Sequence, residues 1–293
     1  MGKLIVAWWN AGISRVCRGQ TKPTPKADKR LQFAPKIISN LVSWYGIDVF
    51  VLGEVSDDFG NCVAEQSGHV WKWGGHGDKR NGDMGCIIRS TSDVKTDKPE
   101  VISFPDTSPT FQARCVIFPF VIDKTEFTVF SAHLHSRKPV DQVNKRRDTA
   151  ICLDMIIRNQ LEQTKHVLVI GDFNDEPFDQ SVSEILKSTR NRLACGKKNH
   201  LYNPCWRFLH DQEGQYGGTA KGNDQNAPRR AFDQVMMSAA FLQEESPLRF
   251  SDRCQIIEIA DNMTSSDSKT NNKNCSFDHM PVLVEFEVTK NGE

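Results

Sequence analysis

Four short apolar runs in this chain end in polar side chains, and a fifth apolar run begins directly after two more. The polar residues at these positions are Asn10, Glu54, His133, Asp172, Asp278 and His279. Open α/β sheets present ligand-binding side chains where their strands end. Each residue alone has an ordinary explanation, because Asp and Asn are common turn formers. Together they favour a sheet protein with a polar site at the ends of several strands.

The first part of the chain has the pattern of a β-α-β unit. Lys3–Trp9 is apolar throughout most of its length and predicts a buried strand, and Asp48–Leu52 predicts a second one. Between them, Pro35–Tyr45 carries apolar residues at helical spacing and is followed by Gly46, a common helix terminator. Strands joined by a helical crossover are parallel, so we expect the first two strands to pair in parallel.

The remainder of the chain carries many short β runs and one long helix, predicted over Asp141–Gln163. The predicted strands are Gly85–Arg89, Val101–Phe104, Ala113–Ile122, Phe127–Leu134, His166–Ile170, Asp233–Ser238, Gln255–Ile259 and Pro281–Val288. Strands this numerous with few helices predict an α/β fold of two packed sheets with helices outside.

The chain has 293 residues, of which 38% are hydrophobic, and this allows a substantial core. We expect one domain over 1–293, with surface loops at 11–34, 190–228 and 261–276, where Gly, Asn, Ser and basic residues accumulate. The nine cysteines are scattered and form no C-x-x-C pair, so we expect most to be reduced core residues.

The overall charge identifies no partner, because Lys plus Arg and Asp plus Glu both number 37. The longest apolar stretch near the N-terminus, Leu4–Trp9, is too short for a signal-peptide core or a membrane span. From these observations we expect a cytoplasmic protein with no membrane partner.

Six segments in chain order resemble the signature segments of one enzyme superfamily: WWNAG, VLGEV, SAHLHS, VIGDFNDEP, FDQVMMS and FDHMPV. This is the endonuclease/exonuclease/phosphatase superfamily, which includes deoxyribonuclease I, apurinic endonucleases, inositol polyphosphate 5-phosphatases and neutral sphingomyelinases. The resemblance extends from Trp8 to Phe286 and is carried most specifically by GDFN and DH-x-P. It implies a four-layer α/β/β/α sandwich, with two mixed β-sheets flanked by helices, and metal-dependent phosphodiester hydrolysis.

Cleavage of a phosphodiester needs a deprotonated water, neutralised phosphoryl oxygens and help for the departing oxygen. Glu54 is the carboxylate that we expect to hold Mg²⁺, with Mn²⁺ as a substitute, because hard cations take oxygen ligands. Asn10 would support this metal site through its amide. The resemblance places Asp278 near the same metal.

Asp172 is the expected general base for water, and Asn174 would orient the nucleophile or a phosphoryl oxygen without adding a repelling charge. His279 would contact the scissile phosphate, with its tautomer fixed by a carboxylate. The resemblance implies that this carboxylate is Asp233.

His133 and His135 lie two apart in a predicted strand, so both should point to one face. Such an H-x-H pair occurs in zinc sites, but the many carboxylates and the lack of thiolates favour Mg²⁺ or Mn²⁺. The resemblance gives His133 a phosphate or leaving-group role. His135 either assists it or is an ordinary strand-end residue.

Two arginines occupy places where related enzymes carry basic residues, namely Arg114 and Arg147. Either a phosphate contact or an ordinary solvated arginine fits each of them. Between Arg15 and Lys36 the chain also has seven basic residues and one acid, among them Lys26, Lys29 and Arg30. A basic loop beside Asn10 suits a nucleic-acid backbone, although a solvated loop explains it equally well.

A second basic stretch with aromatic residues runs from Lys187 to Arg207 and could follow a phosphate backbone. We therefore predict a nuclease, with DNA favoured over RNA as the partner. Two alternatives stay open at this point. One is an inositol-phosphate or phospholipid phosphatase of the same superfamily, and the other is a catalytically silent nucleic-acid-binding module.

Overall fold

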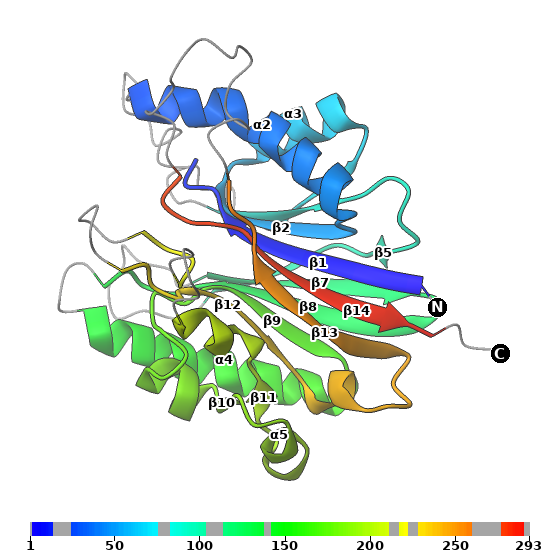
Figure 1. Ribbon diagram of the computed structural model, residues 1–293, viewed down its shortest axis with the longest axis vertical. Helices are drawn as coiled ribbons and strands as arrows, with labels where there is room; N and C mark the ends of the chain where they lie inside the picture. The colour runs from blue at the N-terminus through cyan, green and yellow to red at the C-terminus, as the bar shows by residue number, and fades with distance from the viewer. Residues whose placement is uncertain are drawn as a thin grey trace.

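Two β-sheets lie face to face, and helices cover the outer face of each sheet (Figure 1). The computed structural model describes residues 2–13, 25–75, 83–103, 114–137, 142–210, 217–221, 228–259 and 277–289. In Figure 1, α2 and α3 lie above the sheets, and α4 and α5 lie below them. Both sheets contain parallel and antiparallel pairs, so the expected α/β/β/α sandwich of two mixed sheets is confirmed.

Sheet A has six strands and contains both β1 and β14. In spatial order they are β13 (Leu248–Ile256), β14 (Val282–Val288), β1 (Gly2–Asn10), β2 (Val49–Val55), β4 (Asp83–Ile88) and β3 (Val70–Trp73). The predicted parallel pairing of the first two strands is confirmed, with Trp8 of β1 opposite Val51 of β2. On its other edge β1 pairs antiparallel with β14, so segments from both ends of the sequence meet there.

Sheet B has eight strands, and β8 and β9 lie at its centre. In spatial order they are β10 (Ser188–Thr189), β11 (Leu201–Tyr202), β12 (Asp233–Met237), β9 (Val167–Asp172), β8 (Thr125–His133), β7 (Arg114–Ile122) and β5 (Lys95–Thr96), with β6 (Glu100–Ser103) also paired to β7. The strand pair β8 and β9 is parallel and is joined by the long helix α4 (Val143–Gln163).

Three apolar cores separate the four layers. Alternation along β1 sends Trp8 into the core between the sheets and Trp9 into the core beneath α2. The third core lies beneath α4 and contains Phe130, Leu153 and Val169. Burial of apolar surface stabilises a fold by about 25 cal/mol per Å², and both tryptophans are completely buried at 0% exposure.

Helix α2 (Pro25–Tyr45) begins at Pro25 rather than at the predicted Pro35. Proline favours the first turn of a helix, which is why the sequence placed the start there. Leu31 and Ala34 instead extend the buried apolar stripe toward the N-terminus, so packing holds the earlier turns although Pro35 lacks a backbone donor. The predicted loop 11–34 is therefore wrong for residues 25–34, and 14–24 lie outside the described residues.

Helix α3 (Asp57–Ser67) follows β2 directly and was missing from the sequence prediction. The Ser56 hydroxyl accepts a hydrogen bond from the Phe59 amide at 3.2 Å, which caps the first turn. Gly68 ends the helix with a φ of 69°, a conformation that glycine adopts readily. Capping of this kind explains why a short, polar segment forms a stable helix here.

The region 190–228 was predicted to be a surface loop, and its described part is more regular than that. It contains α5 (Arg192–Lys198), β11 and the 3-10 helix η3 (Pro204–Leu209). Two other short helices are η2 (Ser181–Ile185), a π-helix, and η4 (Ala239–Leu242), a 3-10 helix. The predicted loop 261–276 lies outside the described residues. No helix in the described part of the chain is long and apolar enough to cross a membrane.

Candidate active site

Residues in one row across sheet B form the base of the candidate site. Arg114 of β7 is opposite His133 of β8, His133 is opposite Asp172 of β9, and Asp172 is opposite Asp233 of β12. Directly opposed residues on neighbouring strands present their side chains on the same face of a sheet. The register therefore places His133, Asp172 and Asp233 together. Arg114 occupies the same row, but its side chain lies outside the described residues.

Sheet A contributes Asn10 and Glu54 from the adjacent ends of the parallel strands β1 and β2. The Asn10 amide nitrogen donates to Asp172 Oδ2 at 3.0 Å and approaches Glu54 Oε1 at 3.4 Å. One amide group thus contacts carboxylates from both sheets. Glu54 and Asn174 both have a φ of 51°, which is uncommon outside glycine and occurs often at functional sites.

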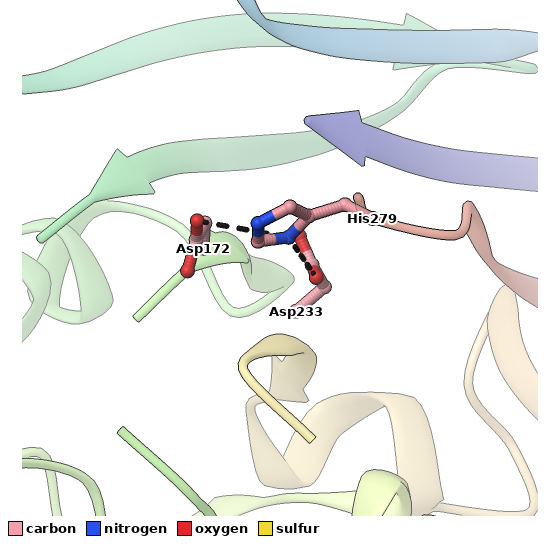
Figure 2. Close-up of side chains that lie close together, drawn as sticks. All are labelled: Asp172, Asp233 and His279. Carbon is pink, nitrogen blue, oxygen red and sulfur yellow. Dashed lines mark hydrogen bonds and ion pairs between the residues drawn. The ribbon is translucent and has the colours of Figure 1, made fainter. Parts of the chain in front are cut away.

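His279 and Asp233 form a short hydrogen-bonded pair beside Asp172 (Figure 2). Nδ1 of His279 lies 2.7 Å from Asp233 Oδ2 and 3.8 Å from Asp172 Oδ2. The Asp233 side chain has no exposed surface, and its backbone amide donates to the Thr219 hydroxyl at 2.9 Å. The short segment around Thr219 also bridges to His279 through Ala220, so it links both members of the pair.

The charge state of His279 follows from its surroundings. Burial alone would lower the pKa of His279, but the charges of Asp233, Asp172 and Glu54, with the hydrogen bond to Asp233, raise it to about 10. The ring is therefore an imidazolium at neutral pH, and both of its nitrogens are hydrogen-bond donors. Such a group can hold a proton opposite an anionic oxygen.

His133 lies close to two carboxylates, Glu54 of sheet A and Asp172 of sheet B. Its Nε2 is 3.8 Å from Glu54 Oε1 and 3.8 Å from Asp172 Oδ2. Strand β8 ends at His133, so His135 does not share a strand with it, although the sequence analysis predicted that it would. His135 instead lies in the following loop and is 2% exposed, and its carbonyl oxygen faces the Arg146 guanidinium at 3.5 Å.

The loop after β9 is fixed by two arginines that the sequence analysis did not identify. Asn174 donates from its side chain to the Leu134 carbonyl at 3.0 Å and from its backbone to Asp172 Oδ1 at 2.9 Å. Arg137 and Arg146 each lie 3.1 Å from Asp175 Oδ1. Asp175 directly follows Asn174 in the sequence, and this acidic residue was the signal that could have indicated these contacts.

Arg146 is also the inward-facing member of the Arg146–Arg147 pair on α4. Its side chain is 6% exposed, whereas the predicted substrate-binding residue Arg147 lies on the exposed face. Successive residues on a helix point about 100° apart, so only one of the two can face the sheet. The structure therefore does not bring Arg147 into the cluster.

Arg30 was predicted to bind substrate from a basic loop, and the structure instead places it in helix α2 with its side chain buried. Its guanidinium lies 2.8 Å from Asp278 Oδ2, with 8% of the side chain exposed, and 5.5 Å from the Phe277 ring centroid. Helix α2 buries Arg30 against the segment that precedes His279. Asp278 was predicted to lie near the metal, and the structure instead pairs it with Arg30. Lys26 and Lys29 belong to α2, but their side chains lie outside the described residues.

The second basic stretch, 187–207, lies away from this cluster. Tyr202 pairs with Met237, at the opposite end of β12 from Asp233. Its aromatic rings are also covered by arginines of the same chain. Arg192 lies 5.1 Å from the Tyr202 ring centroid, and Arg190 lies 5.4 Å from that of Trp206. The stretch that was predicted to follow a phosphate backbone therefore lies away from the candidate site.

The carboxylate oxygens of Glu54 and Asp172 suit a hard divalent cation. Glu54 Oε1 and Asp172 Oδ2 lie within reach of the same Asn10 amide and the same His133 nitrogen. Carboxylate oxygens of this kind are the preferred ligands of Mg²⁺. Asp172, Asp233 and His279 also offer three ligand atoms within 4.8 Å of one another. The 2.7 Å bond between Asp233 and His279 favours a proton-holding pair over direct metal ligation by these two.

A fold of two packed sheets with this row of acids and histidines defines a class of phosphoester hydrolases. A model of the endonuclease/exonuclease/phosphatase family matches residues 70–285, and the chain belongs to this family. The expected superfamily is thus confirmed, and with it a hydrolytic enzyme acting on phosphate esters, of a kind that uses divalent metals. No curated protein matches this chain.

Solved structures of the same fold include proteins with different substrates. The D. rerio TDP2 complexed with single strand DNA product is 18% identical, with a TM-score of 0.63 over 98% of this chain and 100% of that one. The Bacteroides thetaiotaomicron mannosyl-6-phosphatase is 15% identical, with a TM-score of 0.65 over 97% and 99%. The human nocturnin catalytic domain with bound sulfate is 14% identical, with a TM-score of 0.61 over 98% and 95%. At these identities the likeness concerns the fold.

Proposed function

We propose that this protein is a Mg²⁺-dependent nuclease that hydrolyses phosphodiester bonds, with DNA favoured over RNA. The observation that carries this proposal is the Asp233–His279 pair, which lies beside Asp172 and opposite Glu54. A histidine held by a carboxylate and a set of oxygen atoms suited to a metal ion are what the hydrolysis of a phosphate ester requires.

Each side chain then has a distinct task. Glu54, supported by the Asn10 amide at 3.4 Å, would hold Mg²⁺, which would neutralise phosphoryl charge and lower the pKa of water. Asp172 accepts the proton of the attacking water, and its two oxygens are oriented by Asn10 at 3.0 Å and by the Asn174 backbone at 2.9 Å. His279 donates a hydrogen bond to a phosphoryl oxygen, and Asp233 fixes its ring. His133 assists the departing oxygen.

An exposed arginine beside the site supports a nucleic-acid substrate. Phe232 directly precedes Asp233, and two guanidinium groups cover its ring, with the centroid 5.0 Å from Arg137 and 5.9 Å from Arg230. The Phe232 carbonyl accepts the Phe173 amide at 2.9 Å, which fixes this residue beside β9. The Arg230 side chain is 49% exposed, and a guanidinium at this position would bind a backbone phosphate. The D. rerio TDP2 structure, complexed with a single strand DNA product, supports the same class of substrate.

A small phosphate ester is the second candidate substrate. It is favoured by the burial of Arg30, which takes one arginine of the first basic stretch away from the surface, and by the position of 187–207 away from the site. The likeness to a mannosyl-6-phosphatase supports the same alternative. A small substrate needs only the central cluster and no extended surface.

The test is incubation with plasmid DNA, single-stranded oligonucleotide, RNA, an inositol phosphate and a sugar phosphate, with Mg²⁺ or with excess chelator. We expect Mg²⁺-dependent cleavage of the polynucleotides, and none by Asp172→Asn purified in parallel. Turnover of the small esters without cleavage of any polynucleotide would contradict the proposed nuclease activity and indicate a phosphatase. Binding of DNA without turnover of any substrate would indicate a silent binding module.

A further inference from the structure

Two consecutive tryptophans at the end of β1 both donate hydrogen bonds to the Asp233–His279 pair. The indole N–H of Trp8 donates to Asp233 Oδ1 at 2.7 Å, and that of Trp9 donates to the main-chain carbonyl of His279 at 3.0 Å. Neighbouring residues of a strand point to opposite faces. The two indoles therefore reach the pair from the two sides of sheet A.

The Trp8 ring also spans the space between the two halves of the site. Its nitrogen contacts Asp233 of sheet B, and its six-membered ring packs against Gly53 of sheet A, the residue before Glu54. A Cβ atom at Gly53 would lie only 2.4 Å from Trp8 Cη2. The ring thus spans from Gly53 to the Asp233 carboxylate, and it has no exposed surface.

The Trp9 ring holds the segment that carries His279. It packs edge to face on Phe277, with ring centroids 4.8 Å apart, two residues before His279. The indole hydrogen bond to the His279 carbonyl fixes the same segment at a second point. Aromatic pairs of this geometry attract each other beyond the effect of their buried area.

Resting on the proposed phosphodiesterase activity, we propose that Trp8 and Trp9 are positioning residues for the Asp233–His279 pair, and that Trp8 sets its separation from Glu54. Asp233 has one oxygen for His279 and one for Trp8. With both oxygens held, the carboxylate cannot rotate, and the imidazole ring of His279 keeps one orientation. Hydrogen bonds to a charged group are strong enough to matter for such orientation.

The test replaces Trp8 by benzothienylalanine, in which sulfur takes the place of the indole N–H while the ring shape is kept. With bis-p-nitrophenyl phosphate as the substrate, we expect kcat to fall about tenfold or more while KM changes little. The matched control is the same replacement at Trp71, whose indole also donates to a carboxylate, Asp57, at 2.8 Å on an exposed surface. This control should keep the parental kcat.

A second readout requires no activity. The indole proton resonance of Trp8 in an NMR spectrum should shift in Asp233→Asn, whereas that of Trp71 should stay in place. Parental kcat in the Trp8 isostere, or an unmoved Trp8 resonance, would overturn the proposal. If the parent hydrolyses no phosphate ester, the proposed function fails, and the resonance alone decides whether Trp8 holds Asp233.

Discussion

The guanidinium of Arg30 lies 2.8 Å from the Asp278 carboxylate, and this contact joins helix α2 to the residue directly before His279. The arginine is buried and the carboxylate is half exposed, with 8% and 49% of their side chains accessible. An ion pair with one exposed partner contributes less to stability than a fully buried pair. Removal of Arg30 would still leave Asp278 without its counter-charge.

We expect Arg30→Met to lower the free energy of unfolding by about 1 to 2 kcal/mol. Affinity for a short oligonucleotide should change little in the same variant, because Arg30 faces Asp278 instead of the solvent. Urea unfolding and equilibrium binding measure the two effects. A large loss of affinity with parental stability would restore the role that the sequence predicted for Arg30.

Asp172→Asn and His279→Ala should each reduce kcat by about three orders of magnitude or more while the protein stays folded. The two side chains serve one transition state, so the double variant should lose much less than the sum of the single losses. Asp233→Asn should produce a milder form of the His279 defect. Steady-state kinetics on a minimal phosphodiester test this, and near-parental turnover in either single variant would remove that residue from the mechanism.

Excess chelator should abolish hydrolysis, and Mg²⁺ or Mn²⁺ should restore it, because the site offers carboxylate oxygens. In Glu54→Gln we expect a higher metal concentration for half-maximal activity, since this side chain would act through the ion. A titration of activity against Mg²⁺ compares the variant with the parent. Identical curves would show that Glu54 does not hold the metal.

Arg230 flanks Phe232 and is 49% exposed, with a long ion pair to Glu176 at 3.7 Å. Arg230→Ala should weaken oligonucleotide binding and reduce the slope of log affinity against log salt by about 0.7 to 0.9, the value for one phosphate contact. Turnover of bis-p-nitrophenyl phosphate should stay parental. The control is Arg249→Ala, at an arginine paired with Glu287 on sheet A. Equal slopes for parent and Arg230→Ala would argue for a small substrate.

His166 gives a pH dependence that is separate from the active site. Burial, with the nearby charge of Lys165, lowers the pKa of His166 to about 4, and its Nε2 lies 2.8 Å from the Ser246 hydroxyl. The unfolded chain therefore binds this proton more readily than the folded one. Stability from the neutral ring is complete above about pH 6.5 and is lost as the pH falls toward 4.

We expect the free energy of unfolding of the parent to fall between pH 6.5 and 4 by more than that of His166→Asn. The difference between the two proteins should level off below the folded-state pKa, where both states are protonated. Denaturant unfolding at several pH values measures this. A parallel decline of parent and variant would assign the acid sensitivity to other groups.

The strand-end pattern singled out His133 and Asp172, the resemblance added Asp233, and the structure places the three in one row of sheet B. His133, Asp172 and Asp233 each follow or begin an apolar run, and strand ends converge at one edge of a sheet. The partners of Arg30 and Arg146 were not predictable in this way. Asp278 is far from Arg30 in sequence, and the choice between Arg146 and Arg147 depends on the rotation of α4 about its axis, which only packing determines.

Two elements show how tertiary contacts override local signals. The start of α2 at Pro25 contradicts the helix-start preference of Pro35, because buried Ala34 and partly buried Leu31 pack against sheet A. In 190–210, a polar composition predicted a loop, yet buried Leu201 and Cys205 tie the segment to sheet B. Periodicity in such short segments is too weak to indicate structure before the neighbouring strands are known.

The pairing of Gly2 with Val288 has a consequence for the order of events during synthesis. Strand β1 is synthesised well before β14, one of its two neighbours, and His279 precedes β14 in the sequence by only a few residues. Contacts between such distant segments close late in folding. In a nascent chain the Asp233–His279 pair and the indoles of β1 should therefore come together only after β14 has been synthesised.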